Sequence, residues 1–253
     1  MAKQTGETAL IVGASRGIGY AIVEELIATQ QYTNIVAVGR HIELDYALKL
    51  QAERSSISLN AIQADACDEI AMKEVAEMIL NRFTKLSLIC NTVGFLSSET
   101  IKPERNIRDL SLEHLLHACK TNTWTTLNIA KAFQQQLRKN PGIRFAAFSA
   151  RVGSISDNGL GGWYSYRITK AALHMAIRNL SIELRRTNKT LVCYAYHPGT
   201  VATDLSKPFT KNYTRNKIFT PNEAAKYFLN VNNGLSTTDN GFCFDWQGEK
   251  IPW

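Results

Sequence analysis

The sequence predicts a single-domain, doubly wound α/β fold in which helices cover both faces of a seven-stranded parallel sheet. Short apolar runs alternate with segments that repeat apolar residues at helical spacing, which is typical of consecutive βα units. The runs are apolar at successive positions, as strands buried on both faces require. No Ser/Gly-rich or Pro-rich tract divides the 253 residues, so we expect one domain over residues 1–253.

The predicted elements follow one another in a regular order. Strands are predicted at residues 7–14, 34–40, 59–65, 86–94, 143–150, 190–199 and 241–246. Helices are predicted at residues 17–30, 69–83, 109–138, 163–186 and 221–231. In a sheet of this kind, ligands bind beyond the carboxyl ends of the strands. We therefore expect the functional residues just after each apolar run.

The composition narrows the class of protein. The net charge of +7 favours anionic ligands such as a phosphorylated cofactor, but no RNP, zinc-finger or basic-helix signature indicates a nucleic-acid partner. The five cysteines form no CxxC pair and suit a reducing compartment. Neither a signal peptide nor an apolar stretch near the ~20 residues of a membrane span is present, so a cytoplasmic protein without a membrane partner is expected. His114 and His117 lack an evident third ligand, so we predict exposed histidines and no metal site.

A glycine-rich turn follows the first predicted strand and opens the first helix. Glycines permit a close approach between backbone and ligand, and the free N–H groups of a helix N-terminus attract a pyrophosphate. We predict dinucleotide binding here, and a purely structural turn is the alternative. The candidate cofactor-binding residues are Gly13, Ser15, Arg16, Gly17, Ile18 and Gly19.

The glycine spacing, G-x3-G-x-G, resembles that of the short-chain dehydrogenase/reductase family, and later motifs appear in that family's order. The resemblance covers essentially the whole chain and implies a Rossmann fold with oxidoreductase activity. The segments "SYRITKAAL" and "GFCFDWQGEKIPW" are similar to the C-factor and sniffer-type carbonyl reductase branch. The family also implies a homodimer or homotetramer, in which the helical regions at 109–138 and 163–186 pack subunits together.

The residue after the second strand predicts the coenzyme. NAD enzymes usually place an acid here to bind the ribose 2′-hydroxyl. This chain has Arg40 instead, and the first acid downstream is Glu43. Arg40 and Arg16 together would suit a 2′-phosphate. NADP(H) rather than NAD(H) is therefore predicted, with two solvated surface arginines as the alternative.

The resemblance implies further cofactor contacts after the third, fourth and sixth strands. An acid that accepts a hydrogen bond from adenine, with main-chain help from the next residue, corresponds to Asp65 and Ala66. The family's N-N/A-A-G motif corresponds, with departures at its second and third positions, to Asn91, Thr92, Val93 and Gly94. The P-G-x-V-x-T motif, which holds the nicotinamide carboxamide, corresponds to Pro198, Gly199, Val201 and Thr203.

Tyr166 and Lys170 lie four residues apart, so they share one face of the predicted helix at 163–186. A free tyrosine has a pKa of about 10, and a nearby ammonium lowers it. We predict Tyr166 as the proton donor to a carbonyl oxygen and Lys170 as its tuner and as a ligand of the nicotinamide ribose. Tyr164 has no lysine four residues later. By resemblance, Asn122 helps to hold a proton-relay water.

The family's usual serine is missing. Three residues before Gly153, where that serine normally lies, the chain has Ala150. Ser149 is expected on the opposite face of the strand, while Ser154 could reach the site from the loop. Ala150, Arg151 and Ser154 are expected to line the substrate. Losing one donor to a developing oxyanion costs about 10²–10³ in rate, so a modified but working reductase is predicted.

A lid is expected at about residues 204–219, and a solvated basic loop is the equal alternative. Its basic and aromatic residues are Lys207, Lys211, Arg215, Lys217, Phe209, Tyr213 and Phe219. The predicted function is NADP(H)-dependent reduction of a small aldehyde or ketone to an alcohol. The alternative is an NADP(H)-binding signalling or scaffold protein with little turnover, which the missing serine motivates.

Overall fold

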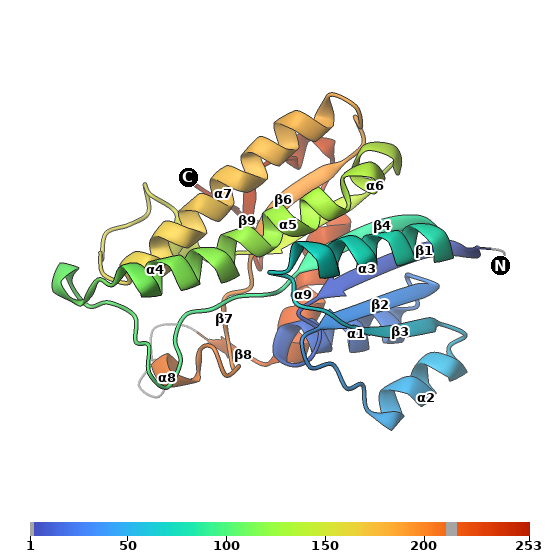
Figure 1. Cartoon of the computed structure of the whole chain (residues 1–253), viewed down its shortest axis with the longest axis horizontal. Coiled ribbons are helices and arrows are strands. Elements are labelled where there is room, and N and C mark those ends of the chain that lie inside the picture. Colours follow the sequence, from blue (N-terminus) through green and yellow to red (C-terminus); the bar gives the residue numbers. More distant parts are fainter. Residues whose placement is uncertain (1–2, 211–216) are drawn as a thin grey trace.

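The computed structural model describes residues 3–210 and 217–253. Within these ranges, seven parallel strands form one sheet, and an eighth, short strand extends it at one edge (Figure 1). The order is β10-β9-β6-β5-β4-β1-β2-β3, and β10 runs antiparallel to β9. The strands are β1 (Gln4–Val12), β2 (Asn34–Gly39), β3 (Ser58–Gln63), β4 (Phe83–Asn91), β5 (Arg144–Phe148), β6 (Val192–His197), β9 (Cys243–Asp245) and β10 (Lys250–Ile251). The predicted parallel sheet is confirmed. The two residues of β10 are too few for a sequence period.

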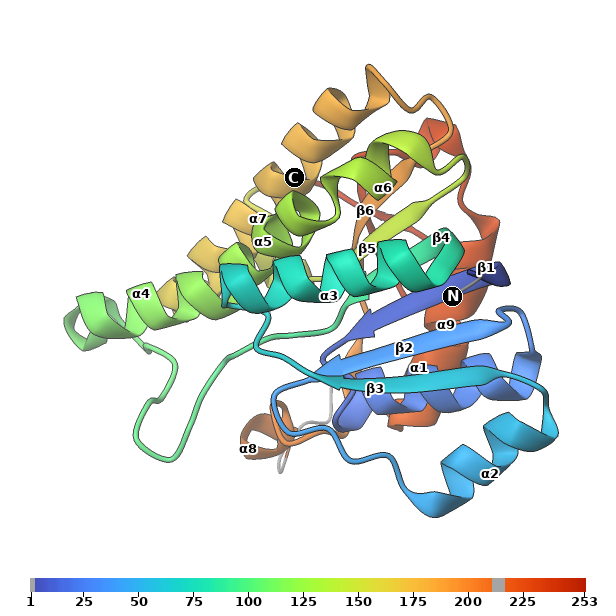
Figure 2. The same cartoon turned by 45° about the vertical axis from the view of Figure 1, so that its right-hand side comes forward.

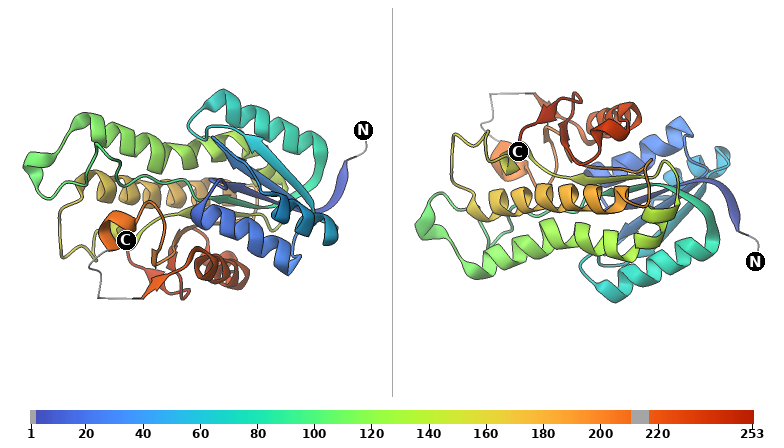
Figure 3. Two further views of the ribbon diagram at one scale, coloured as in Figure 1. Left: turned by 90° about the horizontal axis from the view of Figure 1, so that it is seen from below. Right: turned by 90° about the horizontal axis from the view of Figure 1, so that it is seen from above.

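Helices cover both faces of the sheet, as predicted. They are α1 (Gly17–Thr29), α2 (Tyr46–Arg54), α3 (Glu69–Arg82), α4 (Leu112–Cys119), α5 (Thr125–Ala132), α6 (Gln134–Lys139), α7 (Tyr164–Arg185), α8 (Lys207–Thr210) and α9 (Pro221–Gly234). The first buried cluster joins the sheet to α1, α2 and α9, and the second joins it to α3, α5, α6 and α7. Figure 3 shows the sheet between these two layers.

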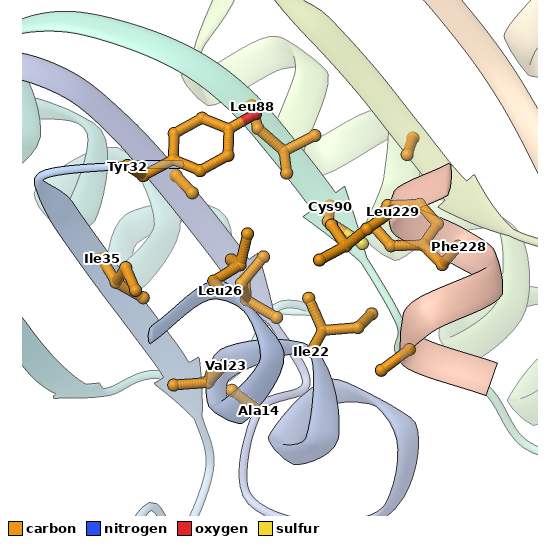
Figure 4. Close-up of a cluster of buried hydrophobic side chains, with 14 of the residues drawn as sticks. Ala14, Ile22, Val23, Leu26, Tyr32, Ile35, Leu88, Cys90, Phe228 and Leu229 are labelled. Carbon is orange, nitrogen blue, oxygen red and sulfur yellow. The ribbon is translucent and has the colours of Figure 1, made fainter. Parts of the chain in front are cut away.

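Most of the apolar residues that recur at strand or helix spacing in the sequence lie in the core. Ile22 and Leu26 of α1 meet Phe228 and Leu229 of α9 beside Cys90 of β4 (Figure 4). These side chains are at most 3% exposed, and burying each one contributes about 1.5–3 kcal/mol relative to exposing it. The interior therefore holds α1 and α9 firmly against the strands whose ends carry the candidate site.

Two helices were not predicted: α2 and the four-residue α8, which lies in the expected lid. Helix α2 follows β2 and buries Leu48 and Ala52 among its nine residues. Two buried positions do not make a recognisable apolar period, so the pattern gave no signal for it. Its first turn is capped by Asp45, whose carboxylate accepts a hydrogen bond from the Leu48 N–H at 2.7 Å.

The predicted helix at 109–138 is divided. A short 3₁₀ turn, η1 (Ile107–Asp109), precedes α4, and a π-helical segment, η2 (Lys120–Trp124), joins α4 to α5. Helix α6 then follows α5 after a bend at Phe133. Widened π turns are rare and frequently occur at functional sites, and this one contains Asn122.

The carboxyl ends of the parallel strands point toward α8 and a small ribbon of two strands, β7 (Thr200–Val201) and β8 (Ile218–Phe219) (Figure 1). From β1 the sheet extends to β2 and β3 on one side and to β4, β5, β6 and β9 on the other. The order in which strands are added to the sheet therefore reverses between the parallel strands β1 and β4, the position at which open α/β sheets bind ligands. Among the described residues, none of the helices combines the length and apolar character that crossing a membrane demands.

Candidate active site

The glycine turn lies between β1 and α1, beside the switch between β1 and β4. A Cβ at Gly13 would lie 2.5 Å from Thr92 Oγ1, and one at Gly19 would lie 2.3 Å from the Gly13 carbonyl oxygen. Gly17 has φ +58°, and Ile18 packs partly against the core. The first turn of α1 receives no side-chain cap from Arg16, so its N–H groups remain available to an anion.

The two predicted phosphate ligands lie at this same end of the sheet. Ser15 packs so closely on Gly39 that a Cβ there would lie 2.1 Å from Ser15 Oγ. This contact brings together the chain segments that carry Arg16 and Arg40. Arg40 is exposed, and Arg16 Nη1 forms an exposed ion pair with Asp204 at 3.0 Å. Such a pair contributes about 0–1 kcal/mol, so Arg16 can exchange partners easily.

Asp65 and Ala66 follow β3 in a tightly bonded turn. Asp65 Oδ1 accepts a hydrogen bond from the Cys67 N–H at 2.9 Å. Ala66 is buried, and its carbonyl oxygen accepts a bond from Asn128 Nδ2 at 3.0 Å. Asn128 of α5, which the sequence did not single out, therefore fixes the turn that presents Asp65.

Asn91 and Thr92 hold the end of β4 in place. The buried Asn91 donates to the hydroxyls of Thr125 and Thr126 at 3.2 and 2.9 Å, and its Oδ1 accepts from the Val93 N–H at 3.0 Å. Thr92 Oγ1 donates to the Val12 carbonyl at 2.9 Å. The unusual threonine thus ties β4 to the end of β1, next to the glycine turn.

Gly94 marks the point where several predicted site residues meet. A Cβ at Gly94 would lie 3.8 Å from both Asn122 Oδ1 and Lys170 Nζ, and 3.7 Å from Leu205 Cδ1. These atoms come from the end of β4, from η2, from α7 and from the start of the expected lid. A substituent on Gly94 would therefore fill part of the space between them.

Lys170 and Tyr166 lie on the same face of α7, as predicted. Lys170 is 3% exposed, and its Nζ donates to the Phe148 carbonyl at 2.9 Å and lies 5.7 Å from the centre of the Tyr166 ring. Burial lowers the pKa of Lys170 to about 8. Burial also raises the pKa of Tyr166, which is opposite to the direction expected from the neighbouring ammonium.

Asn122 is buried near Lys170, and both its amide oxygen and its amide nitrogen are hydrogen-bonded. Its Oδ1 accepts from the Phe95 N–H at 2.7 Å, and its Nδ2 donates to the Phe95 carbonyl at 2.9 Å and to Thr169 Oγ1 at 3.0 Å. The side chain therefore holds the segment after β4 against α7. A further hydrogen bond from a ligand or water can reach the second lone pair of Oδ1, and the main chain of the π-helical turn offers other groups.

The two hydroxyls near the expected serine position each have a hydrogen-bond partner outside the predicted site. Ser149 Oγ is buried and lies 2.8 Å from His174 Nε2, two helical turns along α7 from Tyr166. Ser154 Oγ accepts from the Asp157 N–H at 3.2 Å. Ala150 is 8% exposed at the end of β5. Arg151 pairs with Asp157 and Asp245 at 3.3 and 3.0 Å, so its guanidinium lies next to these two carboxylates.

The segment after β6 lies against the glycine turn. Pro198 precedes Gly199, which has φ +77°, and a Cβ there would lie 2.8 Å from the Phe219 ring. Val201 is buried in β7, and Thr203 Cγ2 would lie 3.5 Å from a Cβ placed on Gly17. The predicted P-G-x-V-x-T motif and the predicted glycine loop therefore meet in space.

The described ends of the expected lid contact the site from two sides. Asp204 pairs with Arg16, and Phe209 of α8 packs on Trp163 with ring centres 5.1 Å apart. Trp163 in turn contacts the Tyr166 ring at 6.2 Å. Lys211, Tyr213 and Arg215 of this expected lid lie outside the described residues.

The prediction of two exposed histidines was wrong for His114. This residue is 8% exposed, and its Nδ1 lies 3.1 Å from Oε1 of Glu104, which is 1% exposed. Sequence spacing alone could not reveal the pair, because Glu104 comes from the irregular segment before α4. Among the described residues, no three His, Cys, Asp or Glu side chains gather as metal ligands would.

Comparisons with known proteins agree with this geometry. The model of the family described as short chain dehydrogenase matches residues 7–214. The chain is 32% identical over 145 residues to C-signal of Myxococcus xanthus, a match that covers 57% of this chain and 82% of that protein. Its fold is similar to that of NADPH-bound carbonyl reductase from chicken fatty liver, with TM-score 0.81, 28% identity and coverage of 97% and 98%. Carbonyl reductase Sniffer of D. melanogaster has the same fold, with TM-score 0.82, 23% identity and coverage of 99% and 100%.

Proposed function

Because the chain belongs to the short-chain dehydrogenase family, a family of oxidoreductases that bind a nicotinamide cofactor, we propose that it is an NADPH-dependent carbonyl reductase. Its substrate would be a small aldehyde or ketone, and its product an alcohol. The observation that carries this proposal is the meeting of Gly94, Asn122 and Lys170 at the carboxyl ends of the strands, with Tyr166 one turn of α7 away. The carbonyl reductase from chicken fatty liver, which is similar over nearly the whole chain, supports the choice of reaction.

The residues fit a dinucleotide. The uncapped first turn of α1 and the glycine turn would hold the pyrophosphate, and Asp65 with Ala66 would receive the adenine. The segment from Asn91 to Gly94 and the motif from Pro198 to Thr203 would border the nicotinamide. Lys170, buried behind Gly94, would hold the nicotinamide ribose.

Arg16 and Arg40 support NADPH over NADH. Both guanidiniums lie at the end of β2 and the glycine turn, where they could form charge-assisted bonds with a 2′-phosphate. Arg16 would leave or share Asp204, an exposed ion pair that costs little to break. The chicken protein was solved with NADPH bound, which agrees with this choice.

When bound, the reduced cofactor would supply a hydride to the carbonyl carbon. Tyr166 would donate its phenolic proton to the carbonyl oxygen, and burial, which raises its pKa, keeps this proton in place at neutral pH. Lys170, with a pKa of about 8, carries its charge at neutral pH and would stabilise the phenolate that remains. Asn122 would hold the relay water through the second lone pair of its amide oxygen or through the main chain of the π-helical turn.

The substrate would lie against Ala150, Arg151 and Ser154 on one side and the lid at about 204–219 on the other. Trp163 and Phe209 form an aromatic boundary next to Tyr166. Since Ala150 has no hydroxyl, the oxyanion would receive one hydrogen bond fewer than in family members that have the serine. We propose a working enzyme whose rate is reduced by this change.

We also propose a single cytoplasmic domain that assembles into a homodimer or homotetramer and binds no nucleic acid. The five described cysteines are free, which suits a reducing compartment. Helices α4 and α7 expose large apolar side chains that a second subunit could cover: Leu112, Leu116, Ile168, Met175 and Ile182.

A second candidate function is an NADPH-binding signalling or scaffold protein with little turnover. Ala150 favours it, because the usual hydroxyl donor is missing, and so does the similarity to a protein named C-signal. The two candidates share the cofactor and differ in turnover.

Tyr166→Phe tests the proposal. The wild-type protein should oxidise NADPH with at least one carbonyl in a panel of aldehydes, ketones and quinones, followed by absorbance. The variant should lose about 10²- to 10⁴-fold in kcat because it lacks the proton donor. NADPH affinity, measured by fluorescence titration, should change less than about threefold, since the ring remains. Tyr164→Phe, two residues earlier, is the matched control and should keep its activity. Tight NADPH binding without turnover in the wild type would favour the second candidate.

A further inference from the structure

Glu104 is a buried carboxylate outside the predicted site. It lies in the segment between β4 and α4, which loops outward before it returns to the body of the molecule (Figure 2). Its side chain is 1% exposed. A buried charge is costly unless hydrogen bonds and opposite charge surround it, so its partners show what the burial achieves.

The first partners of Glu104 belong to the first turn of α7. Glu104 Oε2 accepts from the Ser165 N–H at 3.2 Å, and Oε1 accepts a short bond from Ser165 Oγ. The Glu104 carbonyl oxygen accepts from the Trp163 N–H at 2.6 Å. Trp163 is the N-cap residue of α7 and gives the helix no side-chain cap. Glu104 therefore caps α7 from a distant part of the chain, with its negative charge at the positive end of the helix.

A third contact ties the same carboxylate to α4. His114 Nδ1 lies 3.1 Å from Glu104 Oε1, and the His114 ring contacts Phe95 with ring centres 6.0 Å apart. Both main-chain polar groups of Phe95 are bonded to the Asn122 side chain. One carboxylate thus connects the start of α7 with α4 and, through Phe95, with the segment that holds Asn122.

We propose that Glu104 is a positioning residue for the reaction: it fixes the first turn of α7 and thereby the phenol of Tyr166. Tyr166 directly follows Ser165, so a shift of this turn moves the proposed proton donor relative to Lys170 and Gly94. A displacement of about 1 Å from a reactive geometry can cost roughly 100-fold in rate. Glu104 itself contacts neither Tyr166 nor Lys170 through any hydrogen bond recorded for the described residues. This inference rests on the proposed reductase function.

Glu104→Gln tests the positioning role of Glu104, because it replaces the carboxylate by an amide of nearly the same shape. An amide has one acceptor oxygen, so if that oxygen serves Ser165 Oγ and His114, its NH₂ group faces the Ser165 N–H, and two donors oppose each other. The other orientation keeps the bond from the Ser165 N–H but turns the NH₂ group toward the Ser165 hydroxyl and His114, which lose their acceptor. In either case the cap of α7 is weakened, because the negative charge at the positive end of the helix is lost. Glu99→Gln, the same change at an exposed position of the same segment, is the matched control.

The first measurement is turnover per NADPH-binding site, with sites counted by fluorescence titration so that unfolded protein does not contribute. Glu104→Gln should lower kcat by about 10- to 100-fold, while the Kd for NADPH stays within about threefold of the wild-type value. Glu99→Gln should leave both constants unchanged. An unchanged kcat per site in Glu104→Gln would overturn the proposal, even if the variant melts at a lower temperature.

The second measurement does not depend on activity. Amide hydrogen exchange in Glu104→Gln should become faster at residues 163–167 and stay unchanged in the middle of α7, around residues 173–181. Faster exchange along the entire helix would indicate a general structural role and would contradict the proposal. If the wild-type protein shows no turnover, the reductase function fails, whereas turnover in the wild type with an unaffected Glu104→Gln variant refutes only the role of Glu104.

Discussion

Lys170 is a buried ammonium whose effect on the stability of the fold can be measured separately from its proposed role in the reaction. Its side chain is 3% exposed, and burial lowers its pKa from 10.5 to about 8. Below pH 8 the folded protein must keep this charge out of water, which is destabilising. Between pH 8 and 10.5 the unfolded chain binds a proton that the folded protein does not, so this contribution to stability rises with pH.

The prediction is that Lys170→Met changes the pH dependence of unfolding. Relative to the variant, the wild-type protein should gain free energy of unfolding on the order of 3 kcal/mol between about pH 7 and pH 10.5, because the cost of the buried charge disappears. Urea unfolding at several pH values measures this difference, and other titrating groups cancel in it. The exposed Lys226→Met should show no such trend. A flat difference between wild type and Lys170→Met would mean that Lys170 keeps an ordinary pKa.

Ala150 is the second single residue whose effect can be measured separately, because it lacks the hydroxyl of the family's serine. Ala150→Ser should raise kcat by about tenfold or more, because the new hydroxyl adds a donor where the oxyanion forms. Steady-state reduction of the best carbonyl in the panel measures it. Ser154→Ala is the companion variant. If Ala150→Ser brings no gain and Ser154→Ala abolishes activity, then Ser154 already supplies the hydroxyl and the vacant-donor interpretation is wrong.

At the scale of the elements, the end of β2 determines the proposed coenzyme preference. Because Gly39 has no side chain, Ser15 of the glycine turn packs directly against the end of β2. Arg40 is the first residue after that strand. The contact explains why an arginine on one strand end and an arginine in a separate turn can serve one phosphate. A larger residue than glycine at position 39 would push the turn away.

Arg40→Asp should therefore reverse the coenzyme preference. The carboxylate would repel a 2′-phosphate and accept a bond from a 2′-hydroxyl, so the ratio of kcat/KM for NADPH over NADH should fall at least about tenfold. Arg54→Asp, the same charge change at an exposed position of α2, should leave the ratio unchanged. A wild-type protein that already prefers NADH would contradict the role given to both arginines.

At the scale of the whole molecule, the topology gathers residues that are distant in the chain. The strand order reverses between β1 and β4, so the glycine turn and the segment Asn91–Gly94 become neighbours. The reversal also places α7, with Tyr166 and Lys170, on the same face as the π-helical turn around Asn122. The expected lid reaches back from the far side of the sheet to Arg16 and Trp163.

The order of the βα units, the parallel sheet, the glycine turn and the pairing of Tyr166 with Lys170 could be predicted from the sequence. These features depend on apolar periods and on neighbours within a few residues, which a single sequence displays directly. Prediction failed for α2, α8, β7, β8 and β10, because two buried positions, or elements of two to four residues, carry no period.

The contacts that hold the site and shift the pKa values of its residues arise from the three-dimensional packing of the chain. The capping of α7 by Glu104 joins residues 61 positions apart, and the capture of Ser149 by His174 joins residues 25 apart. Burial, which raises the pKa of Tyr166 and lowers that of Lys170, likewise depends on what the other elements pack around them. Such contacts follow from the way the helices cover the sheet, and local sequence spacing contains no record of them.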